Sequence, residues 1–284
     1  MPPAIYLERA SPGWPGECSH IELPPEGLWA EGRLEHLARR PRVAIVGTRS
    51  PTPYGEAQAR RFSHSLAKEG VVIVSGLARG IDQSAHLAAL DAGGATIAVL
   101  GSGLDRAWPE GPLTDRMRTE GLLLTEHPLG AGPRKHHFPL RNRLISGLSN
   151  AVLVVEAAFA SGSLITARWA VDQGRMVFAV PGRVDHPMAR GCHRLLREGA
   201  ELAEGPEDVL ALLGIREDAR APADPTPLPP LLAALRGETL TADELALRTG
   251  GGLSHVLAEL VALEIDGRVA RSPGGLFRIV ELDS

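Results

Sequence analysis

The sequence lacks the features that mark a secreted or membrane protein. It has two cysteines among 284 residues, Cys18 and Cys192, and neither belongs to a Cys-x-x-Cys pair. This excludes a disulfide framework, and we expect two free thiols. No apolar run reaches the roughly 18 residues of a membrane span, and the first ten residues do not form a signal peptide. We therefore expect a cytoplasmic globular protein without a membrane contact.

An excess of positive charge is also missing. The chain has 30 Lys/Arg and 34 Asp/Glu, a formal net charge of -4. Such a chain does not coat nucleic acid indiscriminately, so a polyanion site must be a local patch. One patch is present in residues 133–143, "PRKHHFPLRNR", where two histidines and four cations surround Phe138. The four cations are Arg134, Lys135, Arg141 and Arg143.

Short apolar runs alternate with helical patterns from Pro41 onward. The runs are VAIVG, VVIVSG, TIAVLG, LLLTE, AVLVVE and MVFAV. Strands that are apolar on both faces belong in a buried parallel sheet whose crossover helices cover each side. We predict helices over residues 54–69 and 163–173, the second ending at Gly174. The pattern predicts an α/β domain over residues 41–216, preceded by a short extension over 1–40.

The C-terminal part of the chain has a different organisation. Residues 217–230 contain five prolines, which favours an extended spacer. In residues 231–284, three helical patterns and a hairpin turning at 273–275 predict a small winged helix, with Thr241 and Glu244 as a capping box. The expected recognition helix has no Lys or Arg, and residues 228–284 hold five basic and eight acidic residues. We expect a module that contacts protein or binds DNA weakly.

Glycines follow several of the predicted strands, at the edge where open parallel sheets bind ligands. They include Gly47, Gly76 and Gly101, and a Ser161–Ser163 turn leads into a helix whose free N–H groups suit an anion. Together these loops could hold phosphates. There is no Gly-x-Gly-x-x-Gly fingerprint and no P-loop, so each glycine could equally serve a tight turn.

The basic segment lies between the fourth and fifth of these strands and can reach the same edge. Arg and Lys could follow several phosphates, while Phe138 offers a face for an unpaired base, worth about 1–3 kcal/mol. This favours a single strand, because a duplex hides its base faces and we find no basic helix to enter a groove. The alternative is that Phe138 is core and the cations form a solvated rim.

Catalytic and metal-binding patterns are weak. The adjacent pairs Cys192-His193 and His136-His137 lack the geometry of a nucleophile with its base or of a metal site. Glu126 and Glu156 stand at strand ends, where we favour a role in orienting arginines over acid–base chemistry. We expect no catalysis, no metal and no cofactor.

Eight motifs, taken in order, resemble the DprA/Smf DNA-processing family. They are AIVGTR, SGLARGID, AHLAAL, TIAVLGSGLD, FPLRNRLISGLS, VVEAAFASGSLITA, VFAVPG and GCHRLLREGA, between about Pro24 and Gly214. The resemblance implies an extended Rossmann-like, mostly parallel sheet with helices on both faces. It also implies a protein that binds and protects single-stranded DNA and loads the RecA recombinase on it during natural transformation. The family's helical N-terminal domain is expected to be absent or reduced.

The resemblance also implies a set of site residues. Arg49 and Lys135 would grip phosphates in a pocket for single-stranded DNA. The other residues expected to line this pocket, including those of the glycine loops, are Gly47, Thr48, Gly76, Phe138, Arg141, Asn142, Ser161, Gly162 and Ser163. His193, Leu196 and Leu202 fall in the segment through which family members form a homodimer, near the surface offered to RecA.

Two rival functions remain to be compared. A nucleotide-processing enzyme similar to the phosphoribohydrolases of the lysine-decarboxylase-like group would need Pro-Gly-Gly-x-Gly-Thr-x-x-Glu, and the chain has VPGRVDHP and ASGSLITA. A winged-helix repressor with a metabolite-sensing domain would need a basic recognition helix. The sequence therefore favours the strand-binding protein over both.

Overall fold

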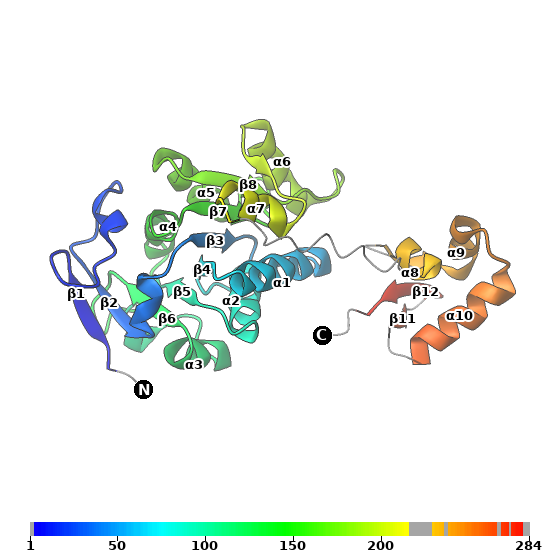
Figure 1. The fold of residues 1–284 in the computed structure, drawn as a ribbon, viewed down its shortest axis with the longest axis horizontal. Helices are drawn as coiled ribbons and strands as arrows, with labels where there is room; N and C mark the ends of the chain where they lie inside the picture. The colour runs from blue at the N-terminus through cyan, green and yellow to red at the C-terminus, as the bar shows by residue number, and fades with distance from the viewer. Residues whose placement is uncertain (1–2, 216–228, 236–237, 266–267, 273, 281–284) are drawn as a thin grey trace. The chain divides into compact units, whose positions relative to one another are not determined.

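The chain forms two compact units, residues Met1–Glu217 and Asp218–Ser284 (Figure 1). The computed structural model describes residues 3–215, 229–235, 238–265, 268–272 and 274–280. The predicted proline-rich spacer, residues 217–230, lies outside the described residues except for Pro229 and Pro230. We describe each unit by itself.

The first unit is built on a nine-stranded sheet with the order β1-β2-β6-β5-β4-β3-β7-β8-β9. Its centre is parallel and consists of the six predicted apolar runs. They are β3 (Arg42–Val46), β4 (Val72–Ser75), β5 (Thr96–Val99), β6 (Leu122–Thr125), β7 (Ala151–Val154) and β8 (Met176–Ala179). Every residue of these six strands is buried except the first residue of β8, which is half-buried. This confirms the predicted mostly parallel sheet. The short strand β9 (Glu201–Leu202) pairs with β8 and ends the sheet.

Helices cover both faces of this sheet. Side chains of α1 (Pro53–Lys68), α2 (Ile81–Asp91) and α7 (Pro206–Leu212) pack on one face, where Val43, Ile45 and Ile73 point. Those of α4 (His137–Gly147), α5 (Ser163–Asp172) and α6 (Arg190–Arg197) pack on the other, together with Ala44 and Val46. Helix α3 (Pro112–Thr119) precedes β6. The alternation of neighbouring β3 residues between the two cores follows from the pleat of a strand.

Two of the predicted helices match the structure within a residue. Helix α1 begins after Thr52, whose hydroxyl accepts a hydrogen bond from the Gly55 N–H at 3.1 Å. Helix α5 ends before Gly174, which has a φ of 68°, the left-handed conformation of a C-cap glycine. Sequence periodicity therefore located the helices that flank the sheet edge.

The described residues before β3 contribute two strands to the sheet. Strand β1 (Ile5–Glu8) pairs antiparallel with β2 (Gly27–Gly32), and β2 pairs antiparallel with β6. Two 3₁₀ helices, Gly16–Ser19 and Leu34–Leu37, complete this segment. The short extension predicted for residues 1–40 is thus an antiparallel edge of the same unit.

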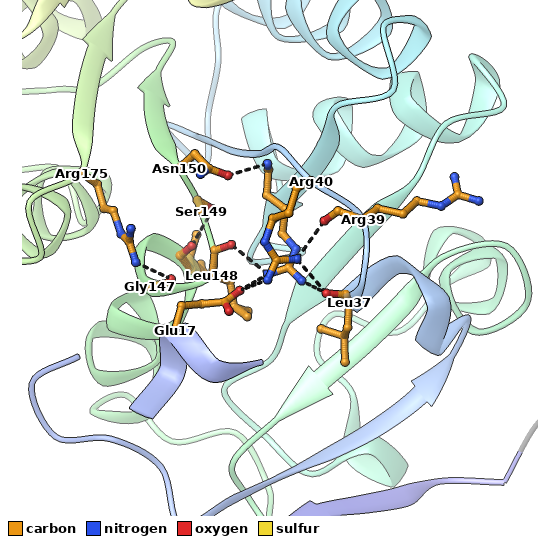
Figure 2. Close-up of polar contacts among 11 residues, drawn as sticks. Glu17, Leu37, Arg39, Arg40, Gly147, Leu148, Ser149, Asn150 and Arg175 are labelled. Carbon is orange, nitrogen blue, oxygen red and sulfur yellow. Dashed lines mark hydrogen bonds and ion pairs between the residues drawn. The ribbon is translucent and has the colours of Figure 1, made fainter. Parts of the chain in front are cut away.

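A buried arginine fixes this segment to the start of β3. The fully buried Arg42 side chain donates to the Glu17 carboxylate, to the Leu37 carbonyl and, at 3.2 Å, to the Leu148 carbonyl. The Glu17 carboxylate also accepts from Arg40 at 2.7 Å. Figure 2 shows Glu17, Leu37 and Leu148 gathered around this point, with Asn150 beside them. Three chain segments far apart in sequence are therefore joined by one guanidinium.

The second unit has the element order of a winged helix. It contains α8 (Pro230–Ala234), β10 (Leu240–Thr241), α9 (Ala242–Thr249), α10 (Leu253–Ile265), β11 (Val269–Ser272) and β12 (Leu276–Ile279). The three strands form one sheet in the order β10-β12-β11, and Leu245, Val256, Leu260 and Phe277 contribute to the core. The predicted capping box is present, since the Thr241 hydroxyl accepts from the Glu244 N–H at 3.3 Å.

Candidate nucleic-acid interface

A cavity of about 500 Å³ lies at the carboxyl ends of β3 and β7. Strand β3 has β4 on one side and β7 on the other, so the chain order reverses here. Such a reversal is where open α/β sheets bind ligands, because the loops that follow neighbouring strands diverge. The cavity walls come from the loop after β3, the start of α2, the start of α4 and the turn into α5.

Most of the predicted strand-binding residues come together at this cavity. Those that line it are Gly47, Arg49, Lys135, Phe138, Arg141, Asn142, Ser161, Gly162 and Ser163. Thr48 and Gly76 do not line it. The Thr48 N–H donates to the Glu156 carbonyl at 2.7 Å, and the Gly76 carbonyl accepts from Arg141 at 3.0 Å. These two residues support the walls, and contact of the others with DNA stays a prediction.

The rim of the cavity carries accessible positive charge beside an aromatic ring. Arg49 and Lys135 are exposed, and Phe138 is half-buried. The guanidinium carbon of Arg49 lies 5.4 Å from the centroid of the Phe138 ring, within the range of a cation–π interaction. Phe138 is therefore not a core residue, and only that part of the alternative raised by the sequence is wrong.

A further arginine of the cavity lining, Arg141, is buried, unlike the exposed cations of the rim. Arg141 is 3% exposed, and burial lowers its pKa to about 10, with a further lowering from Arg49 and an opposing effect of Asp82. Burial likewise raises the pKa of Asp82, and Arg141 opposes the rise. Arg141 stays protonated at neutral pH, but its side chain is buried and donates to the Gly76 carbonyl. Phosphates consequently find their accessible cations at the rim, on Arg49 and Lys135.

The two glutamates at strand ends have different roles. Glu126 holds Arg143, whose Nη1 and Nη2 donate to its two oxygens at 2.8 and 2.6 Å, so the expectation that it orients an arginine fits. For Glu156 the expectation is wrong. Its carboxylate accepts from the backbone N–H and the hydroxyl of Thr52, at 2.9 and 2.5 Å, and thus fixes the start of α1.

Several lining residues were missed by sequence reasoning. They are Val46, Ala78, Asp82, Pro139, Ile145, Ile165 and Thr166. The apolar ones resemble ordinary core residues in sequence, so no signal distinguishes them. Asp82 had a signal, because a lone carboxylate follows a buried strand in SGLARGID and its Oδ2 accepts from the Gly76 N–H at 3.1 Å.

The structure also places the cysteine–histidine pair and the residues expected at the homodimer contact. Cys192 is fully buried, and burial raises the pKa of its thiol to about 12, which removes it as a nucleophile. His193 is half-buried, with Nε2 3.0 Å from the Gly182 carbonyl oxygen. Leu196 packs against the core, whereas Leu202 is 47% exposed on β9. Within the described ranges, no three His, Cys, Asp or Glu side chains are placed to hold a metal ion.

One exposed stripe of α10 is apolar. Leu253, Leu257, Val261 and Ile265 are between 42% and 81% exposed, and the helix has no Lys or Arg. A helix that reads a DNA groove needs cations for the phosphates on either side.

The described part of the chain also contains no helix long and apolar enough to cross a membrane.

Comparisons with known proteins point to the same family for both units. Residues 6–214 match the family model of DNA recombination-mediator protein A, and residues 216–275 match that of the DprA winged helix domain. The chain is 43% identical to Protein Smf of Escherichia coli over 270 residues, 90% of this chain and 72% of that protein. It is 45% identical to DNA processing protein DprA of Streptococcus pneumoniae over 200 residues, 70% of each chain.

Solved structures give the same match. The X-ray structure of DNA processing protein A from Streptococcus pneumoniae superposes with a TM-score of 0.70 at 42% identity, over 73% of this chain and 74% of that one. DNA processing protein A from Helicobacter pylori, solved for its single-stranded DNA binding mode, gives a TM-score of 0.68 at 31% identity. That match covers 75% of this chain and 96% of the other.

Proposed function

Because the chain belongs to the DprA/Smf family of DNA-processing proteins, we propose that its cavity binds single-stranded DNA. The observation that carries the proposal is the exposed Arg49 and Lys135 beside the half-buried Phe138 at the rim of one cavity. The single-stranded DNA binding mode described for the Helicobacter pylori relative supports it. The acidic net charge confines strand binding to this patch.

Each part of the rim has a distinct role in this proposal. Arg49 and Lys135 bind phosphates and release counterions, which makes the affinity depend on salt. The N-terminus of α5, after Gly162, adds the partial positive charge of the helix dipole, while its first N–H groups donate within the Ser161–Ser163 turn. Phe138 supplies the stacking face that selects an unpaired base over a duplex.

The proposal includes the wider role that the family resemblance implies. The chain protects single strands and loads the RecA recombinase on them during DNA uptake, without catalysis of its own. It acts as a homodimer through the segment containing His193, Leu196 and Leu202. The apolar stripe of α10 supports a protein contact for the winged helix rather than a DNA contact.

The test is fluorescence anisotropy with a labelled oligo-dT at several salt concentrations. A matched duplex and a labelled mononucleotide serve as competitors, and an Arg49→Glu/Lys135→Glu variant serves as the site knockout. The matched control is Arg60→Glu/Lys68→Glu, which makes the same charge change at exposed positions of α1. We expect salt-sensitive binding that prefers the single strand, is abolished in the first variant and is kept in the second.

Two outcomes would overturn this function. Binding of the mononucleotide comparable to that of the oligomer would favour the nucleotide-processing enzyme. Equal losses in both variants would mean that bulk charge, and not the cavity rim, attracts the strand.

A further inference from the structure

Three histidine rings form a cluster beside the cavity, outside its walls. The rings of His127 and His137 are stacked, with centroids 3.9 Å apart, and His136 meets His137 edge-on at 4.6 Å. His136 is exposed, while His127 and His137 are half-buried. The outermost ring of this cluster is therefore open to solvent. The cavity function proposed above does not use any of the three.

The cluster adjoins Phe138 through one glycine. The Gly101 carbonyl oxygen lies 3.0 Å from His137 Nδ1, and a Cβ placed on Gly101 would lie 3.1 Å from Phe138 Cδ1. Gly101 follows β5 and His127 follows β6, whereas the cavity is lined by residues that follow β3, β4 and β7 and by the start of α4. Cavity, Phe138 and histidine cluster thus follow one another along the carboxyl edge of the sheet.

The contacts of these rings indicate that a partner would bind their aromatic faces rather than their nitrogen atoms. His127 Nε2 is buried and has no hydrogen-bond partner among the described residues. Burial lowers the pKa of His127, as do His137, Arg143 and His136 in decreasing order, while Glu126 raises it. The lowered pKa favours the neutral form of His127, and the stacked rings form an aromatic surface next to the exposed cations Arg134 and Lys135.

We propose that the His127–His137–His136 cluster is a second stacking site, which binds a base of the same single strand beyond the cavity. Imidazole rings stack with unpaired bases, and Lys135, which lines the cavity and precedes His136, can bind the intervening phosphate. This inference rests on the proposed function, and it extends the binding path from one cavity to a line along the sheet edge.

The sheet geometry sets the length of strand required. From β3 to β6 there are three strand spacings of about 4.8 Å, or roughly 14 Å. At the rise of about 3.4 Å per nucleotide of a stacked strand, this distance corresponds to at most about four nucleotides. Because His136 directly follows Lys135, which lines the cavity, a strand that fills the cavity needs only a few further nucleotides, at most about four, to lie on the cluster.

The experiment measures dissociation constants for an oligo-dT series that lengthens one nucleotide at a time. In the unaltered chain we expect affinity to rise about tenfold over about four added nucleotides, the effect of one stacked base. In His136→Ala this gain should disappear while the affinity for the shortest binding oligomer stays unchanged. His136→Phe keeps an aromatic face and should restore the gain. The matched control is His255→Ala, an exposed histidine on α10.

Each alternative result has a definite meaning. A length-dependent gain that persists in His136→Ala, or is not restored by His136→Phe, overturns the second stacking site. An equal loss for short and long oligomers would place His136 at the cavity and also overturns it. If the unaltered chain binds no oligomer of any length, the proposed function fails instead, and with it the premise of this inference.

Discussion

Lys135 and Arg141 stand six residues apart, and burial gives them different relations to DNA. Lys135 is exposed, so a phosphate can replace its water and counterions. Arg141 is 3% exposed, donates to the Gly76 carbonyl and interacts with the Asp82 charge. The sequence predicted that both would line one site, but linear spacing does not show which cation is buried. That depends on the phase of α4, and hence on where the helix begins.

Charge and stacking at the rim should be separable by their salt dependence. Lys135→Ala should weaken single-strand binding and flatten its dependence on salt, because fewer counterions are released. Phe138→Ala should weaken binding by about 1–3 kcal/mol and keep the salt slope. Anisotropy titrations with oligo-dT at several salt concentrations measure both quantities. Identical slopes in two folded variants would contradict this division of roles.

Two glycines of the predicted site should respond differently to a methyl group. A Cβ on Gly76 would lie 1.5 Å from Arg141 Nη1, so Gly76→Ala must displace a buried guanidinium and should destabilise the fold by about 1–3 kcal/mol. Gly162 has a helical φ of -62° and nothing within 4 Å of its Cβ position, so Gly162→Ala should change stability by less than about 0.5 kcal/mol. Urea unfolding compares the two variants. Similar effects would mean that Arg141 moves aside freely.

His86 makes the stability of the first unit depend on pH. The Thr96 hydroxyl donates to the Ile73 carbonyl and accepts from His86 Nδ1, and burial lowers the pKa of His86 to about 3. Below about pH 6.5 the unfolded chain binds a proton that the folded chain does not, so stability falls with falling pH, by at most about 1.4 kcal/mol per unit. Above pH 6.5 this effect is absent. Unfolding free energies at pH 7 and 5 should differ less in His86→Asn than in the unaltered chain.

At the scale of elements, the parallel strands were predictable and the antiparallel edge was not. The strands β3 to β8 are apolar on both faces because helices cover both sides, and that gives a continuous run in the sequence. Strand β1 is the edge strand, with three of its four residues exposed or half-buried, and a proline-rich loop separates it from β2, where two of six are half-buried. Their place is set by pairing with β6 and by the Arg42 contacts, which no local pattern encodes.

The contact between Glu17 and Arg42 should be a major link between the N-terminal segment and the sheet. Glu17→Gln removes the counter-charge of a fully buried guanidinium, and we expect a loss of about 2–3 kcal/mol in unfolding free energy. Tryptophan fluorescence during urea unfolding measures it, since all four tryptophans lie in the first unit. The control Glu207→Gln removes an exposed pair with Arg61 at 4.0 Å and should cost less than about 0.5 kcal/mol. Equal costs would mean that Arg42 is held by its carbonyl acceptors alone.

At the scale of the whole molecule, each unit has its own apolar core and its own exposed apolar residues. In the first unit the strand β9 ends the nine-stranded sheet, and Leu202 on it is 47% exposed. An exposed apolar side chain on a sheet edge is a common place for a second copy to bind. This supports the proposed homodimer, in which two cavities could bind one strand.

Leu202 offers a direct test of that arrangement. Leu202→Glu should convert the dimer to a monomer in light scattering, because two like charges would face each other across a symmetric contact, with the unfolding midpoint kept. Affinity for a strand long enough to reach two cavities should fall at least tenfold, since avidity is lost, while a short oligomer binds as before. Leu212→Glu, at a 46% exposed position of α7, is the matched control. A dimer that survives Leu202→Glu would place the contact elsewhere, whereas loss of short-oligomer binding would mean that Leu202 also shapes the cavity.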